Sequence, residues 1–333
     1  MNNKKFKVAF VGCGAVSPNH FFALSLLDNV EIVALCDKVY ANAEKSKAKY
    51  GLSSKIYTDY DEMISTEALD AVHIATPHFL HAPMTIAALK KNINVFLEKP
   101  MCINQQQIDD MIAAEKESSA RVCVCFQNRF ISATQKAKEI VEADGGAISA
   151  YGSVFWERNI PYYTESDWRG RYETEGGGVM INQAIHTIDL VCQFLGKPKK
   201  LWATKANHHL KGIIEVEDTC EGMIEFESGS NGNFFTTTAF HGKDSTLVYI
   251  LTKNHKLELS PPNLRVDGED ISFENELAFV GKECYGNGHN IIIRDFYNAL
   301  ENGTPVPVSL ESAQYAVRVL LAAYKSNDRE TEI

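Results

Sequence analysis

The chain has 333 residues, of which 45% are hydrophobic and 23% are charged. This composition is that of a globular protein with a large core and excludes intrinsic disorder as the main state, while the length favours two domains. A net charge of −10 at pH 7 argues against a nucleic-acid or anionic-membrane surface, and no segment approaches the roughly 18 consecutive apolar residues of a membrane-spanning helix. We therefore expect neither a nucleic acid nor a membrane as a partner.

The N-terminal residues and the cysteines bear on the cellular compartment. The basic start is followed by a short apolar run that glycines interrupt, without the hydrophobic region of a signal peptide. The eight cysteines lie mostly in apolar runs and include no CxxC pair, which predicts neither a disulfide framework nor a metal site. The sequence thus predicts reduced thiols and a cytoplasmic location.

Short β-branched runs alternate with longer helical patterns over residues 1–125. The predicted strands are Lys7–Val11, Ile32–Cys36, Ala71–Ala75, Asn94–Leu97 and Arg121–Cys125. The predicted helices between them are Phe21–Leu27, Ala41–Tyr50, Ala82–Lys91 and Gln105–Ser118. Because strands separated by helices need crossover connections, residues 1–125 are predicted to form an α/β domain, a Rossmann-type doubly wound parallel sheet with helices on both faces.

The pattern changes after residue 125, where strands begin to follow one another without helices between them. The elements expected in chain order are a helix at Ala133–Ala143, a strand at Ser149–Glu157, a helix near Met180–Leu195, successive strands from Leu201 to Phe273, and helices at Asn290–Glu301 and Leu310–Lys325. Residues 126–333 are therefore predicted to form an α+β domain with a largely antiparallel open sheet.

The first predicted strand runs into a glycine-containing turn and then into a helix, which is the context of a dinucleotide-binding turn. Gly12 permits the tight turn, and Gly14 lets the backbone approach a pyrophosphate whose charge the helix N-terminus offsets. The turn consists of Gly12, Cys13, Gly14, Ala15, Val16 and Ser17. Ser17 stands where a third glycine is common, and a glycine-rich turn without a ligand is the alternative for this motif taken alone.

An acidic residue at the end of the second predicted strand strengthens the nucleotide interpretation. Asp37 follows Ser17 by 20 residues, where a carboxylate accepts hydrogen bonds from the adenosine ribose hydroxyls and repels a 2′-phosphate. The alternative is an ordinary helix N-cap. Together, the turn, the spacing and Asp37 predict NAD as the cofactor, in preference to NADP.

Two further segments follow the ends of predicted parallel strands, where ligands bind in doubly wound sheets. They are Ala75-Thr76-Pro77, followed by His81, and Glu98-Lys99-Pro100. Combined with the glycine turn, they resemble the glucose–fructose oxidoreductase, inositol dehydrogenase and MocA family of nicotinamide-dependent oxidoreductases. The resemblance implies that Thr76, Pro77, His81, Glu98 and Lys99 belong to the cofactor site, and that Lys99 lies beside the nicotinamide and contacts the reacting substrate oxygen. Taken alone, Lys99 reads as a surface lysine before a turn proline.

The segment from Glu175 to Asp189 resembles the glycine-rich active-site helix of that family, which ends in His-x-x-Asp. Asn182, His186 and Asp189 are spaced i, i+4 and i+7, as on one helix face. The resemblance makes His186 the acid/base candidate, whereas by spacing alone it is a structural histidine. Many polyol-oxidising relatives carry aspartate where this chain has Asn182, which can hold a hydroxyl but supplies no charge to His186.

Aromatic and arginine side chains lie between the two predicted domains. Rings can pack on the C–H face of a sugar, and guanidinium groups can hold hydroxyl, carboxylate or phosphate oxygens. The candidates are Tyr162, Tyr163, Trp168, Arg169 and Arg171, together with Gln127 and Arg129 after the last predicted parallel strand. The alternatives are aromatics on a subunit surface and a polar domain crossover.

These features predict an NAD-dependent oxidoreductase that acts on a secondary alcohol of a sugar, a sugar derivative or a cyclic polyol. Lys99 and His186 are the expected catalytic residues, and Lys99, Gln127, Arg129, Trp168, Arg169, Asn182 and His186 the expected substrate-binding residues. A family member that uses NAD transiently to hydrolyse glycosides and a non-catalytic dinucleotide sensor are the alternatives. We also expect a homodimer or homotetramer formed through the C-terminal sheet.

Overall fold

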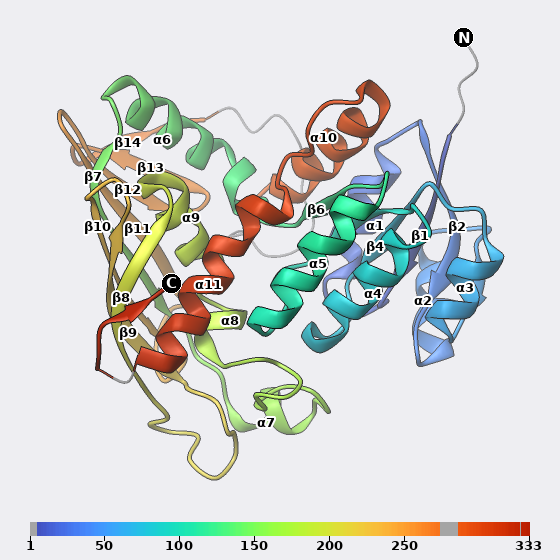
Figure 1. The fold of residues 1–333 in the computed structure, drawn as a ribbon, viewed down its shortest axis with the longest axis horizontal. Coiled ribbons are helices and arrows are strands. Elements are labelled where there is room, and N and C mark those ends of the chain that lie inside the picture. Colours follow the sequence, from blue (N-terminus) through green and yellow to red (C-terminus); the bar gives the residue numbers. More distant parts are fainter. Residues whose placement is uncertain (1–4, 274–285, 327) are drawn as a thin grey trace.

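The computed structural model describes residues 5–273, 286–326 and 328–333. It contains a six-stranded and a nine-stranded sheet, which lie side by side with helices between and around them (Figure 1). Among the described residues, no helix is long and apolar enough to cross a membrane.

The six-stranded sheet is parallel throughout, and its strand order β3-β2-β1-β4-β5-β6 is doubly wound, as predicted. Its strands are β1 (Phe6–Val11), β2 (Val30–Cys36), β3 (Lys55–Tyr57), β4 (Ala71–Ile74), β5 (Asn94–Leu97) and β6 (Val122–Val124). Its helices are α1 (Ser17–Ser25), α2 (Tyr40–Lys49), α3 (Tyr60–Thr66), α4 (His81–Leu89) and α5 (Gln105–Glu117). Strand β3 and helix α3 were not predicted from the sequence. The three residues of β3, at the edge of the sheet, carry too little apolar pattern to stand out.

The nine-stranded sheet has the order β14-β13-β12-β11-β7-β10-β9-β8-β15 and is antiparallel except where β7 pairs with β10. Its strands are β7 (Ala147–Phe155), β8 (Pro198–Ala206), β9 (Thr219–Phe226), β10 (Asn231–Thr237), β11 (Ser245–Thr252), β12 (Lys256–Ser260), β13 (Asn263–Val266), β14 (Glu269–Ile271) and β15 (Thr331–Glu332). The largely antiparallel sheet predicted for this half of the chain is confirmed.

The described helices of the second half are α6 (Ser132–Ala143), α7 (Ile160–Thr164), α8 (Val179–Asn182), α9 (Ile185–Leu195), α10 (Gly288–Asn302) and α11 (Leu310–Ser326). Of these, α6, α8, α9 and α11 contact the nine-stranded sheet. Helix α9 packs on β7, α11 packs on β8, and α10 returns to contact α1 of the first sheet. A boundary at residue 125 stays a prediction, since α10 follows it in sequence but joins the N-terminal half in space.

The predicted continuous helix near Met180–Leu195 is wrong. The structure has two helices, α8 and α9, with a break at Gln183 and Ala184. The amide of Ala184 donates to the carbonyl of Val179, five residues back. The break removes the single helix face expected for Asn182, His186 and Asp189, and it places Asn182 on a separate turn that reaches toward the first sheet.

Candidate functional site

The glycine turn after β1 is shaped by contact with the next strand of the sheet. Gly12 has a φ of +90°, and a Cβ at this position would lie 2.4 Å from the carbonyl oxygen of Ala75, so only glycine fits. Gly14 is exposed, and a Cβ there would meet no protein atom within 4 Å. Gly12 is therefore needed by the fold, whereas the open space at Gly14 fits the close approach of a ligand.

Asp37 fixes the conformation of this turn from the end of β2. Its Oδ2 accepts from the backbone N–H of Cys13 at 2.9 Å, and its Oδ1 accepts from the backbone N–H of Val39 at 2.8 Å. Helix α2 begins after Val39 without a side-chain cap, so Asp37 is not its N-cap. The half-exposed carboxylate keeps unused lone pairs beside the turn, where a ribose would lie in a dinucleotide complex.

His81 joins the two loops that follow β4 and β5. Its Nε2 lies 2.8 Å from the carbonyl oxygen of Thr76, and its Nδ1 lies 2.6 Å from the carbonyl oxygen of Pro100. Burial lowers the pKa of His81, and the two carbonyl oxygens oppose that effect because only the protonated ring can donate to both. His81 is fully buried, so it positions Thr76, Pro77 and Lys99 from behind.

Lys99, at the end of β5, reaches across to the break between α8 and α9. Its Nζ donates to the main-chain oxygen of Asn182 at 3.0 Å. Burial lowers the pKa of Lys99, and the neighbouring carboxylates Glu98 and Glu175 oppose that effect. The side chain stays partly exposed, so a substrate oxygen can reach an ammonium group that the protein already orients.

His186, in the first turn of α9, has one ring nitrogen that the protein leaves unsatisfied. Its Nε2 lies 3.3 Å from the Gln127 side-chain nitrogen, whereas the buried Nδ1 has no hydrogen-bond partner. Burial, followed by the charge of nearby Lys99, lowers the pKa of His186 well below 6.5. The imidazole is therefore neutral at pH 7. Because the Gln127 amide donates to Nε2, the single ring proton lies on Nδ1, an N–H without an acceptor.

Asn182 is held by a carboxyl group to which the sequence analysis gave no role. Its Nδ2 donates to Oε1 of Glu175 at 2.6 Å and to the Tyr162 hydroxyl at 3.2 Å. Burial raises the pKa of Glu175 to about 7, so this group carries a proton over part of the neutral range. The feature of the sequence that could have indicated this role is the position of Glu175, directly before three glycines.

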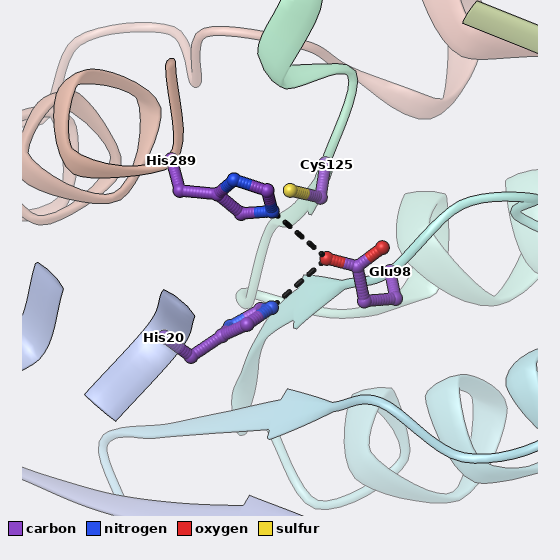
Figure 2. Close-up of side chains that lie close together, drawn as sticks. All are labelled: His20, Glu98, Cys125 and His289. Atoms are coloured by element: carbon purple, nitrogen blue, oxygen red, sulfur yellow. Dashed lines mark hydrogen bonds and ion pairs between the residues drawn. The ribbon is translucent and has the colours of Figure 1, made fainter. Parts of the chain in front are cut away.

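Four buried side chains form a cluster around Glu98, the residue before Lys99 (Figure 2). The cluster consists of His20 from α1, Glu98 after β5, Cys125 after β6 and His289 from α10, with their ligand-capable atoms within 4.8 Å of one another. Sequence patterns predicted no metal site, because these residues are scattered along the chain. Zinc uses all of these donor types, so the structure introduces a candidate that the sequence did not.

Hydrogen bonds account for this cluster without an ion. His20 Nε2 lies 2.9 Å from Glu98 Oε1, shorter than the roughly 3.3 Å between two ligands of one tetrahedral zinc ion. Behind it, His20 Nδ1 lies 3.0 Å from His73 Nδ1, and His73 Nε2 lies 2.9 Å from the Tyr297 hydroxyl. With one proton on each imidazole, Tyr297 donates to His73, His73 to His20 and His20 to Glu98, so every contact has a donor and an acceptor.

The same contacts keep Glu98 ionised. Burial opposes ionisation, but hydrogen bonds from His20 and His289 outweigh it and hold the pKa of Glu98 well below 4.5. Glu98 is only 5% exposed, and its Oε2 accepts from the backbone N–H of Lys99 at 3.2 Å. Glu98 is therefore a buried anion that orients the peptide of Lys99, not a surface that a cofactor can touch.

Arg129 and Asp189 form a buried ion pair away from these contacts. Arg129 donates from Nε and Nη2 to the two carboxylate oxygens of Asp189 at 2.8 and 2.6 Å, and from Nη1 to the Ser312 hydroxyl at 2.7 Å. Every nitrogen of the guanidinium thus has a protein acceptor. The pair joins η2 (Gln127–Phe130) to α9 and α11, which explains Arg129 as a structural residue.

The glycine turn and an oriented lysine lie at the same edge of a doubly wound sheet, opposite a neutral histidine with an unsatisfied nitrogen. This combination indicates an NAD-binding oxidoreductase. Residues 6–126 match the model of the oxidoreductase family with an NAD-binding Rossmann fold, and residues 134–273 match the GFO/IDH/MocA C-terminal domain. The chain belongs to the GFO/IDH/MocA family. It is an NAD-dependent oxidoreductase that acts on CH–OH groups, and the resemblance seen in the sequence is confirmed.

Curated relatives are similar over nearly the whole chain. The inositol 2-dehydrogenase of Salmonella typhimurium is 28% identical over 98% of this chain and 96% of its own length. The D-glucoside 3-dehydrogenase of Escherichia coli is 25% identical over 100% of this chain and 98% of its own. The chain is thus similar in sequence, over nearly its whole length, to dehydrogenases of sugars and polyols.

Solved structures share the fold. The WlbA dehydrogenase from Bordetella pertussis, in complex with NADH and UDP-GlcNAcA, superposes with a TM-score of 0.88 at 24% identity and covers 100% of this chain and 99% of its own. Levoglucosan dehydrogenase, in complex with NADH and levoglucosan, has a TM-score of 0.90 at 20% identity and covers 99% and 100%. Both match the two-sheet architecture from end to end.

The contrast between the two turn glycines is testable. Gly12→Ala should lower the free energy of unfolding by at least about 2 kcal/mol, because the new Cβ meets the Ala75 carbonyl and φ is positive. Gly14→Ala should leave it within about 0.5 kcal/mol and weaken NADH binding. Denaturant unfolding and fluorescence titration with NADH measure the two effects, and equal destabilisation by both substitutions would contradict the assignment.

Proposed function

We propose that the protein is an NAD-dependent dehydrogenase of a secondary alcohol in a sugar, a sugar derivative or a cyclic polyol. The observation that carries this proposal is that the Lys99 ammonium, from the first sheet, donates to the main-chain oxygen of Asn182 at 3.0 Å, four residues before His186 in α9, where its charge lowers the pKa of the imidazole. A cation and a neutral base at one point are what removal of a hydroxyl proton needs.

The two side chains have different tasks in the oxidation. His186 accepts the hydroxyl proton at Nε2, the nitrogen that carries no proton because the Gln127 amide donates to it, while Lys99 donates to the substrate oxygen and stabilises the negative charge that develops there. Bound NAD supplies the hydride acceptor at C4 of the nicotinamide. In the reverse direction His186 returns the proton, and Asn182 and Trp168 help to hold the sugar.

The cofactor would lie along the carboxyl ends of β1, β2 and β4. We assign the pyrophosphate to the turn residues Gly12, Gly14, Ala15 and Val16, the adenosine ribose to Asp37, and the nicotinamide side to Thr76, Pro77 and Lys99. His81 and Glu98 support this site from behind, as their burial indicates. The seven described cysteines form no disulfide, which fits the cytoplasmic location that we propose.

Loss of either catalytic side chain should reduce turnover much more than cofactor affinity. Lys99→Ala removes the charge that stabilises the developing oxyanion, and His186→Ala removes the proton acceptor, so each should lower kcat at least about 100-fold. A screen of sugars and polyols at the NADH absorbance identifies the substrate, and NADH titration checks affinity. If His186→Ala keeps near-normal kcat while Lys99→Ala abolishes it, the histidine is structural and Lys99 is the acid/base.

The pH profile provides an independent check on these two roles. Because the pKa of His186 is below 6.5 and that of Lys99 is below 10.5, the acidic limb of kcat/KM should lie below pH 6.5 and the basic limb below pH 10.5. Substrate turnover without net NADH would favour a glycoside hydrolase. NADH binding without any turnover would favour a sensor.

Asp37 should make the enzyme prefer NAD to NADP. Its carboxylate repels a 2′-phosphate, although the adjacent Lys38 softens the repulsion, so kcat/KM should be higher with NAD. Asp37→Ser should lower the ratio of kcat/KM with NAD to kcat/KM with NADP. Asn42→Ala, which removes only a 3.2 Å contact to the same carboxylate, serves as the control. Equal or better use of NADP by the unmodified enzyme would overturn the assignment.

The face of the nine-stranded sheet that no described helix covers suggests a homo-oligomer. Its outward side chains include the cross-strand pairs Trp202–Met223 and Tyr151–Tyr249. Phe155, Phe235 and Phe240 line a hollow of about 540 Å³ on it. Met223 is 40% exposed, and an apolar face of this extent is usually covered by a partner.

Light scattering should therefore give a mass of at least two chains of 37.1 kDa at micromolar concentration. Met223→Glu should shift the protein toward monomer, because it places a charge in the contact. The same change at Leu26, which is 50% exposed on the opposite half of the molecule, should have no effect. A mass of 37.1 kDa for the unmodified protein would contradict the proposal.

A further inference from the structure

A row of alternating aromatic rings and arginines runs beside Lys99. The Arg158 guanidinium lies 4.7 Å from the centre of the Trp156 ring and 4.9 Å from that of Tyr162. The Arg169 guanidinium lies 4.5 Å from Tyr162 and 4.8 Å from Trp168. We call these five residues the arginine ladder: Trp156, Arg158, Tyr162, Arg169 and Trp168. Stacking on rings fixes the planes of both guanidinium groups.

Neither arginine of the ladder forms an ion pair in the described part of the chain. Glu157, next to Arg158, is bound to His241 at 3.0 Å, and the charge of Arg169 opposes the burial that raises the pKa of Glu175, without an ion pair between the two. The Nε atoms of both arginines are buried without a hydrogen-bond partner. An N–H donor left unsatisfied in this way costs about 1–3 kcal/mol, so the ladder lacks an acceptor that a ligand could supply.

The ladder is attached to the catalytic groups through Tyr162. The Tyr162 hydroxyl lies 3.2 Å from Asn182 Nδ2, and the Asn182 carbonyl accepts from Lys99. On the other side, the Trp168 ring lies 4.7 Å from the His78 ring, next to the Thr76-Pro77 loop. All five ladder side chains are partly exposed, so a molecule held at Lys99 can also reach the arginines.

We propose that Arg158 and Arg169 bind an anionic group of the substrate, so that the sugar oxidised at Lys99 and His186 carries a carboxylate or a phosphate. Both groups offer paired oxygens to the planar fork of a guanidinium, which lysine does not match. A neutral polyol would leave two oriented cations unpaired next to the reacting carbon. The inference rests on the proposed function for the location of that carbon, but the anion site itself can be tested by binding alone.

The test uses the NADH-loaded protein and three probes that share one ring: D-glucose, D-glucuronate and D-glucose 6-phosphate. Calorimetric titration should give at least about 10-fold tighter binding for one or both charged probes than for D-glucose. Which charged probe binds more tightly distinguishes a carboxylate from a phosphate. Raising the salt concentration should weaken only the charged probes. If neither binds more tightly than D-glucose, the proposal is overturned.

Variants assign the effect to the ladder. Arg169→Gln should lower the affinity for the charged probe about 10- to 100-fold and leave the affinity for D-glucose unchanged. Arg169→Lys keeps the charge without the planar guanidinium and should lower the affinity for the charged probe less. Arg294→Gln removes an exposed guanidinium elsewhere and should change neither. Thermal melts confirm that each variant is folded, and undiminished binding by folded Arg169→Gln would overturn the assignment.

The outcomes separate the two proposals. Tight binding of a charged probe without NADH formation on any sugar would support the anion site and contradict the proposed dehydrogenase activity. NADH formation on neutral sugars, with equal binding of the three probes, would support the dehydrogenase activity and contradict the anion site.

Discussion

One hydrogen bond, from the ammonium of Lys99 to the main-chain oxygen of Asn182, holds the candidate site together. It spans from the end of a parallel strand to a break between two helices of the other half of the chain. A main-chain oxygen can accept it only because the helix stops there: in a continuous helix the Asn182 carbonyl would be used by a later amide. The interruption between α8 and α9 is therefore what lets the two halves meet at a charged group.

The groups around this bond are kept in place by buried charge. Glu98 is fixed by His20 and His289, which lie on α1 and α10, so the helix after the cofactor turn and a helix from the end of the chain hold one carboxylate. On the opposite side, Glu217 accepts from the backbone N–H groups of Gly178 and Met180 and secures the start of α8. Lys99 thus lies between two anchored segments, which limits its motion without covering its ammonium.

The sequence predicted what depends on local pattern. The parallel strands and the glycine turn have a characteristic spacing, and the roles of Lys99 and His186, which stay predictions, came from the resemblance to a family. The rest depends on distance in space: the cluster at Glu98 gathers residues 20, 98, 125 and 289, and no spacing rule joins them. The break at Gln183 was also hidden, since the segment contains no proline and its apolar period continues across it. The ion-pair partner of Arg129, which was predicted to bind substrate, lies 60 residues away and could not be read from the sequence.

The asparagine at position 182 has a different meaning once its partner is known. Its side chain does not touch His186 but donates to Glu175, a buried carboxyl group with a pKa of about 7. An aspartate at this position would face Glu175 across the same 2.6 Å and would have to share a proton with it. An asparagine lets Glu175 titrate without sharing its proton with residue 182. Asn182 therefore acts on the buried carboxyl group beside Lys99, and its side chain makes no described hydrogen bond to His186.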